Sequence, residues 1–142
     1  MAITRRQLAA FAPALAAAQT SQKNDKTALP SKCYIYQDLA VKKNANGNEQ
    51  RAVFDGATHA KIPVELHLTN LAPGMAPHAA HRHVHEEMVM LHKGQLDVTI
   101  EGKTTRVTSG SVVYVNSNEE HGWKNPGPDR AEYFVIAVGK ES

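Results

Sequence analysis

Short runs of alternating apolar and polar residues recur along most of the chain, separated by turn-forming residues. In residues 63–71, Val64, Leu66 and Leu68 alternate with polar side chains. A period of two residues is typical of a β-strand with one buried face. Similar candidate strands occupy residues 33–39, 52–54, 88–91, 95–100, 104–108, 111–115 and 131–138. No sustained helical periodicity follows Ser31, so the pattern predicts about ten short strands in an all-β sandwich or barrel.

The first residues follow a different pattern. Arg5 and Arg6 precede an alanine-rich apolar stretch that ends in small residues, which is the layout of an export signal. The stretch T-R-R-Q-L resembles a bacterial twin-arginine signal, and this resemblance implies export of the folded protein to the periplasm. If the N-terminus is not a signal, we expect a cytoplasmic protein.

The alternative for this segment is an ordinary N-terminal helix, because Leu8, Phe11 and Leu15 share one helical face. A proline between them opposes a stable helix. We therefore expect an export signal peptide at residues 1–18 and a polar, turn-rich linker at residues 19–32. Residues 33–142 are expected to form a single β-barrel domain.

Composition excludes several classes of protein. A chain of 142 residues is long enough for one domain with a core. Without Arg5 and Arg6, the 16 basic residues fall to 14, against 14 acidic ones, so no basic surface for nucleic acid is indicated. No apolar run reaches the roughly 20 residues of a membrane-spanning helix. The single cysteine, Cys33, excludes an internal disulfide and a thiolate-rich metal cluster, and we expect it to be a small, partly buried residue rather than a nucleophile.

Histidines cluster in the middle of the chain, with five of the eight between residues 78 and 92. In an extended strand, residues two apart point the same way, so His81 and His83 would project side by side. Both imidazoles could then reach one ion. A glutamate from the next strand could add an oxygen ligand, and His121, which follows a turn-rich loop, could complete the site.

Two stretches resemble the motifs of the cupin superfamily. Residues 74–94 resemble the first motif, with its His-x-His pair, glutamate and closing glycine, and residues 110–125 resemble the second, with its histidine and asparagine. Gly74 stands one residue too far from the first histidine. Asn116 and Asn118 replace the usual proline and glycine, and an asparagine tolerates the left-handed conformation of a turn glycine. The resemblance implies a single-domain cupin of the cupin-2 type, which is a double-stranded β-helix or jelly-roll barrel.

The resemblance also implies a ligand set. One divalent transition metal per subunit would be held by His81, His83, Glu87 and His121. Three nitrogens and one carboxylate suit iron or manganese, which we expect, and also nickel or zinc. Four protein ligands on an octahedral ion leave two positions open for water, substrate or dioxygen. The alternative is a barrel that keeps these residues without a metal.

Other polar residues near the motifs receive smaller roles. Glu65 and His67, on the strand over residues 63–71, are candidates for lining the pocket. His78 would line the mouth of the site or lie on the surface, His85 would lie in a turn, and Glu86 would be a surface or interface charge. Four further side chains are expected to pack rather than to bind metal or substrate: Met88 and Met90 in a core or interface, and Tyr114 and Trp123 in the barrel.

Two functions fit these observations. The first is a small metal-dependent enzyme, an oxidoreductase or dioxygenase-like protein acting on a small molecule. The second is a non-catalytic protein that binds a sugar or an organic acid. We also expect a homodimer, because the short exposed edge strands of a jelly roll favour pairing.

Overall fold

The structure is a computed structural model and describes residues 26–140. Within this range the all-β prediction is confirmed. The chain forms nine β-strands and one short 3-10 helix, in the order η1 (Tyr36–Asp38), β1 (Lys42–Lys43), β2 (Glu49–Ala57), β3 (Pro63–Leu71), β4 (Glu86–Lys93), β5 (Gln95–Ile100), β6 (Lys103–Thr108), β7 (Val112–Val115), β8 (His121–Lys124) and β9 (Ala131–Val138). The signal peptide predicted at residues 1–18 lies outside the described residues.

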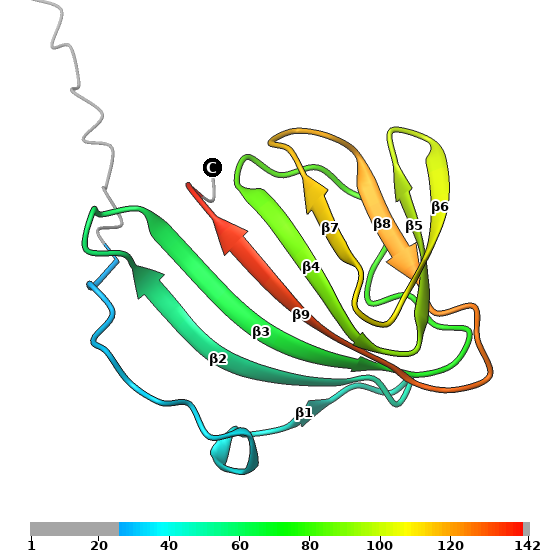
Figure 1. Ribbon diagram of the computed structural model, residues 1–142, viewed down its shortest axis with the longest axis horizontal. Helices are drawn as coiled ribbons and strands as arrows, with labels where there is room; N and C mark the ends of the chain where they lie inside the picture. The colour runs from blue at the N-terminus through cyan, green and yellow to red at the C-terminus, as the bar shows by residue number, and fades with distance from the viewer. Residues whose placement is uncertain (1–25, 141–142) are drawn as a thin grey trace, which may run out of the picture.

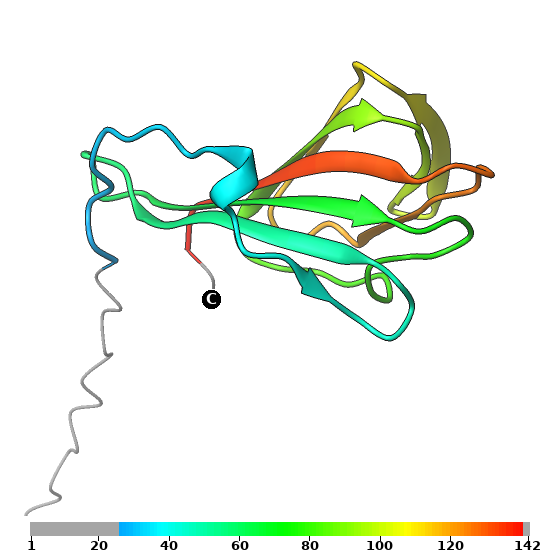
Figure 2. The same cartoon turned by 90° about the horizontal axis from the view of Figure 1, so that it is seen from below.

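These strands form two sheets. The larger has the order β1-β2-β3-β9-β4-β7, and the smaller has the order β6-β5-β8. Within each sheet, every pair of neighbouring strands is antiparallel. Figure 1 shows the larger sheet as a curved layer with β5, β6 and β8 at one end of it, and Figure 2 shows the same arrangement from below. Two antiparallel sheets around a shared core form a jelly-roll barrel, as predicted.

The hydrophobic core lies where the two sheets face each other. Its residues alternate along their strands with side chains on the opposite face, as a two-residue period requires. The larger sheet contributes Leu71, Val89, Leu91, Val113, Val115, Ala131, Tyr133 and Val135, and the smaller contributes Leu96, Val98 and Trp123. The core therefore fills one end of the barrel.

Strand β3 turns its polar face toward the barrel interior. Residues in register across antiparallel strands place their side chains on the same face of the sheet. His67 is in register with Val135 of β9, which is in register with Val89 of β4. Since both valines belong to the core, His67 points inward, and so do Glu65 and Thr69. Leu71, at the end of the strand, shares the inward face and belongs to the core, whereas Val64, Leu66 and Leu68 face outward.

The outer face of β4 and β7 carries a band of large apolar side chains, which we call the outer band. Met90 is in register with Val112, and Met88 with Tyr114. Val112 is 65% exposed, Tyr114 54% and Met90 37%. Both methionines face away from Glu87, as predicted. The prediction that Tyr114 packs inside the barrel is wrong, because the inward positions of β7 are taken by its two buried valines.

Residues 33–39 do not form the predicted strand. Instead, the helix η1 interrupts an extended segment that packs along β2. The Tyr34 and Phe54 ring centroids are 5.6 Å apart, and the Arg51 guanidinium lies 4.5 Å from the centroid of the Tyr36 ring. The aromatic residues that favoured a strand in the sequence therefore contact the outer face of β2 through their side chains.

The residues before η1 also lie against β2. Ala28 forms a bridge with Ala57, and the backbone N–H of Leu29 donates to the Ala57 carbonyl at 2.9 Å. Part of the predicted linker is thus attached to the barrel. Cys33 is exposed, so the expectation of partial burial is wrong. Among residues 26–140, no helix has the length and apolar character needed to cross a membrane.

Two turns of the structure account for the residues that the motifs have at positions 94 and 118. Gly94 joins β4 to β5 with a φ of 86°, and a Cβ there would lie 2.7 Å from the Arg130 carbonyl oxygen. Asn118 has a φ of 63°, the left-handed conformation that an asparagine tolerates in place of the usual glycine. Its backbone N–H donates to the His83 carbonyl at 2.7 Å. The Asn118 turn therefore anchors the segment that carries His83.

Candidate metal centre

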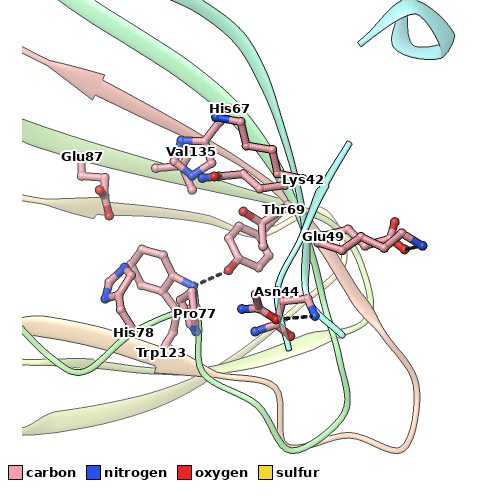
Figure 3. A pocket seen from close by; sticks show the side chains of 14 residues that line it. Lys42, Asn44, Glu49, His67, Thr69, Pro77, His78, Glu87, Trp123 and Val135 are labelled. Atoms are coloured by element: carbon pink, nitrogen blue, oxygen red, sulfur yellow. Dashed lines mark hydrogen bonds and ion pairs between the residues drawn. The ribbon is translucent and has the colours of Figure 1, made fainter. Parts of the chain in front are cut away.

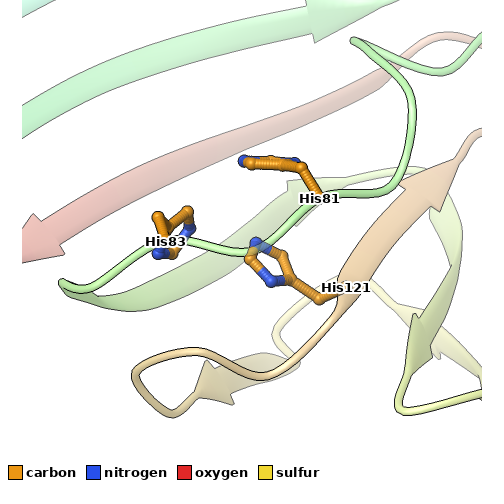
Figure 4. A group of neighbouring side chains, drawn as sticks. All are labelled: His81, His83 and His121. Carbon is orange, nitrogen blue, oxygen red and sulfur yellow. The ribbon is translucent and has the colours of Figure 1, made fainter. Parts of the chain in front are cut away.

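Three predicted ligands come from two segments that pair only briefly. His81 and His121 form an isolated bridge, in which each backbone N–H donates to the other's carbonyl at 3.0 Å. His83 follows in irregular chain, so the prediction that His81 and His83 share a strand is wrong. The predicted convergence is nevertheless confirmed, because ring nitrogens of these three histidines lie within 4.8 Å of one another. Figure 4 shows their rings turned toward a common centre.

Glu87 brings a carboxylate to the same centre from β4. Its Oε2 lies 3.5 Å from Nε2 of His83, and its Oε1 lies 3.5 Å from Nε2 of His121. Neither contact is a hydrogen bond. His83 Nε2, His121 Nε2 and Glu87 Oε1 are buried and have no hydrogen-bond partner among the described residues. Buried polar atoms are rarely left unsatisfied, so three of them on neighbouring side chains indicate a site that could hold a cation.

Backbone carbonyls orient two of the imidazoles. Nδ1 of His83 lies 2.8 Å from the His85 carbonyl oxygen, and Nδ1 of His121 lies 2.9 Å from that of Glu119. Because a carbonyl only accepts, each Nδ1 carries the proton and each Nε2 has a free lone pair. In metal sites, a hydrogen bond of this kind from the second ring nitrogen fixes the orientation of a ligating histidine.

His81 completes the group at its solvent side. Loss of solvent around the ring lowers the pKa of His81, and the neighbouring His78, His121 and His83 lower it further. A lowered pKa favours the neutral imidazole, which is the form that binds a metal. The four predicted ligands thus supply three imidazole nitrogens and one carboxylate, a donor set that fits a divalent transition metal.

His85 lies closer to this centre than the sequence suggested. It occupies a bend, as predicted, but its ring is half-buried and stacks on His83, with centroids 3.7 Å apart and planes at 12°. Its ring nitrogen also falls within 4.8 Å of ligand atoms of His83 and Glu87. Because the His83 and His85 rings are stacked and nearly parallel, the nitrogen lone pairs of the two rings lie in parallel planes and do not converge on one ion. His85 therefore supports the His83 ring by packing.

A cavity of about 360 Å³ opens beside the centre. In Figure 3, Glu87 lies at one end, His67 and Val135 on one wall, and His78 and Trp123 on the opposite wall. His67 and His78 therefore line the pocket, one of the two places foreseen for His78. Glu65 lines a second cavity of about 220 Å³ on the other side of Glu87.

Trp123 packs in the barrel, as predicted, and its Nε1 donates to the hydroxyl of Tyr133 at 2.9 Å. Sequence reasoning missed a group of lining residues that come from β1, β2 and the turn between them: Lys42, Lys43, Asn44, Asn48, Glu49 and Gln50. No periodicity connected them with the histidines, because β1 is only two residues long.

Known structures resemble this fold at low sequence identity. An RmlC-like cupin from Shewanella frigidimarina NCIMB 400 is 15% identical, with a TM-score of 0.65 over 79% of this chain and 95% of that chain. A predicted oxalate decarboxylase from Thermotoga maritima is 19% identical, with a TM-score of 0.64 over 77% and 100%. The polyketide cyclase RemF from Streptomyces resistomycificus is 16% identical, with a TM-score of 0.61 over 78% and 81%.

No match is found among curated proteins. The family model described as "Cupin domain" matches residues 67–137, which is half of the chain and includes all four predicted ligands. Together with the two-sheet barrel and the histidine centre, this match shows that the chain belongs to the cupin domain family.

Proposed function

We propose that this protein is a metal-dependent oxidoreductase of the dioxygenase-like kind, with a small-molecule substrate. The metal ligands would be His81, His83, Glu87 and His121. The observation that carries the proposal is the gathering of three buried ligand atoms that have no hydrogen-bond partner among the described residues: they belong to His83, His121 and Glu87, and the Glu87 carboxylate lies 3.5 Å from both imidazoles. A divalent cation among them would satisfy all three at once.

A bound metal would supply Lewis acidity or redox chemistry at the coordination positions that the protein leaves open. We propose iron or manganese, because an imidazole-rich site with one carboxylate and no thiolate suits either. The cavity of about 360 Å³ reaches Glu87, so a small molecule in it would lie next to the centre. Two of the similar structures carry the names of enzymes, a predicted oxalate decarboxylase and a polyketide cyclase, which supports a catalytic use of this fold.

His67 is the acid–base group of this proposal. Its Nδ1 lies 2.9 and 3.2 Å from the two carboxylate oxygens of Glu65. The carboxylate accepts a hydrogen bond from Nδ1–H, which leaves Nε2 to exchange a proton with a molecule in the cavity. Glu65 positions the ring and has no other part in the chemistry.

Metal content and turnover test the proposal together. We expect wild-type protein to carry about one iron or manganese per chain and to consume oxygen with a substrate from a panel of small molecules. His83→Ala should lose both, since it removes a central ligand. His92→Ala is the control, because His92 is exposed and outside the ligand set. Turnover retained by a metal-free His83→Ala protein would contradict the proposal.

The second candidate is a non-catalytic protein that binds a sugar or an organic acid. The polar rim of the cavity favours it, since amide side chains such as Asn44 and Gln50 can bind hydroxyl or carboxylate groups. Zinc or no metal, together with ligand binding and no turnover, would favour this candidate over the enzyme.

We also propose a homodimer that uses the outer band, because an exposed apolar sheet face can pair with its copy across a two-fold axis. Export to the periplasm remains our proposal for the localisation, and it rests on the sequence of residues 1–18.

A further inference from the structure

We infer that the cavity selects a small organic anion and that Lys42 binds the carboxylate of that anion. This inference deepens the proposed function, because it names the substrate class of the same site. It rests on the balance of charged side chains around the cavity and on the position of Lys42 away from Glu87.

The carboxylates that line the cavity are both engaged. Glu87 lies between His83 and His121 in the metal centre. Glu49 forms an ion pair with Lys43 at 2.7 Å. The hydrogen bond that Lys43 donates in this pair lowers the pKa of Glu49, so both side chains stay charged and their charges cancel. Neither carboxylate is therefore available to neutralise another cation on the lining.

Lys42 is the cation left without a counter-charge. Within residues 26–140 it forms no ion pair, unlike its neighbour Lys43. Lys42 is in register with Gln50, Gln50 with Thr69, and Thr69 with Tyr133. Residues in register share a face, and all four line the cavity. Lys42 thus extends from the same face of the sheet as Gln50 and Thr69, whose side chains can donate hydrogen bonds, which is a suitable setting for a carboxylate.

The two ends of the cavity differ in what they can bind. Glu87 and the metal centre lie at one end, and Lys42 lies toward the other, with Val135 between them (Figure 3). A divalent ion at the first end would add positive charge to the excess supplied by Lys42. A molecule that spans the cavity would therefore place an oxygen group at the centre and a carboxylate at Lys42, with a short apolar chain between them.

Calorimetric titration of the full-length, metal-loaded protein tests this. The probes are malonate, succinate and glutarate, each compared with its neutral diamide at constant ionic strength. We expect at least one dicarboxylate to bind and its diamide to bind at least tenfold more weakly. Lys42→Gln should weaken dicarboxylate binding about tenfold, in keeping with the loss of one charged hydrogen bond, and Lys42→Arg should restore most of it.

Lys103→Gln is the matched control, because it removes the same charge from an exposed position of β6 outside the cavity. Equal affinity for dicarboxylate and diamide, equal weakening by Lys42→Gln and Lys103→Gln, or no dicarboxylate binding below about 10 mM would overturn the inference. Metal analysis of the same samples reports on the proposed function separately. Dicarboxylate binding that depends on Lys42 in a metal-free protein would support the inference and contradict the metal-dependent enzyme.

Discussion

At the scale of the residue, Tyr133 links the core to the cavity. It is among the largest fully buried side chains, and its hydroxyl accepts a hydrogen bond from Trp123 beside the pocket. Burial raises the pKa of Tyr133 to about 12, although hydrogen bonds with Trp123 and Thr69 oppose the rise. The folded protein therefore holds the neutral phenol at pH values where the unfolded chain has lost the proton.

This difference makes stability depend on pH in the alkaline range. Below pH 10 the phenol is neutral in both states, so its contribution to stability is complete there. As the pH rises from 10 toward 12, only the unfolded chain releases the proton, and the free energy of unfolding should fall by about 2–3 kcal/mol. Urea denaturation at several pH values checks this. Tyr133→Phe should lose this part of the pH dependence, and an unchanged slope in that variant would contradict the assignment.

The candidate ligands could be predicted at this scale because the spacing of His81, His83, Glu87 and His121 is a property of the sequence. Their surroundings could not. His85 has the same parity as His81 and His83 in the sequence. The structure shows that the chain bends at His85 and that its ring stacks on His83. Lys42 reaches the cavity through the pairing of β1 with β2, which no local pattern encodes.

At the scale of the element, β3 shows what alternation predicts and what it leaves open. The strand over residues 63–71 was predicted with the correct bounds, as was the grouping of Val64, Leu66 and Leu68 on one face. The side that faces inward depends on which layers cover the sheet, and here it is the polar side. The segment 33–39 was predicted wrongly, because its β-forming residues make side-chain contacts with β2 and not backbone pairs.

The turn between β4 and β5 provides a stability test at this scale. Gly94→Ala would meet the Arg130 carbonyl oxygen at 2.7 Å in addition to the cost of a left-handed φ. We expect a loss of about 3 kcal/mol in the free energy of unfolding, measured by urea denaturation. Gly102→Ala is the control, because its φ is also positive but nothing lies within 4 Å of the added Cβ. It should cost only about 1 kcal/mol, and an equal cost for both variants would contradict the role of the close contact.

At the scale of the whole molecule, the candidate metal centre lies where the two sheets meet. Glu87 comes from the larger sheet, and His121 comes from the smaller one. The two-sheet barrel could be predicted from the strand pattern and the two motifs together. The outer band could not, because its exposure depends on which residues of β4 and β7 stand in register and on what covers that face.

The proposed dimer is tested at this scale. Tyr114→Glu places a charge in the outer band, where burial against a second copy would be costly. We expect light scattering to give a dimer mass for wild-type protein and a monomer mass for the variant. Thr104→Glu, at an exposed position on the opposite face of β6 from the core, should remain a dimer. A wild-type protein that elutes at monomer mass would contradict the use of the outer band.

The hydrogen bonds that orient His83 and His121 have a consequence for how the site tolerates sequence change. Both imidazoles are held by main-chain carbonyls only two residues away, at His85 and Glu119. The His85 ring also stacks on His83, but a substitution at Glu119 leaves the carbonyl in place, so the orientation of the His121 ring does not depend on the identity of that side chain. It depends on the number of residues in each loop. The site should therefore accept many replacements at Glu119 but be disrupted by the insertion or deletion of a single residue in either loop.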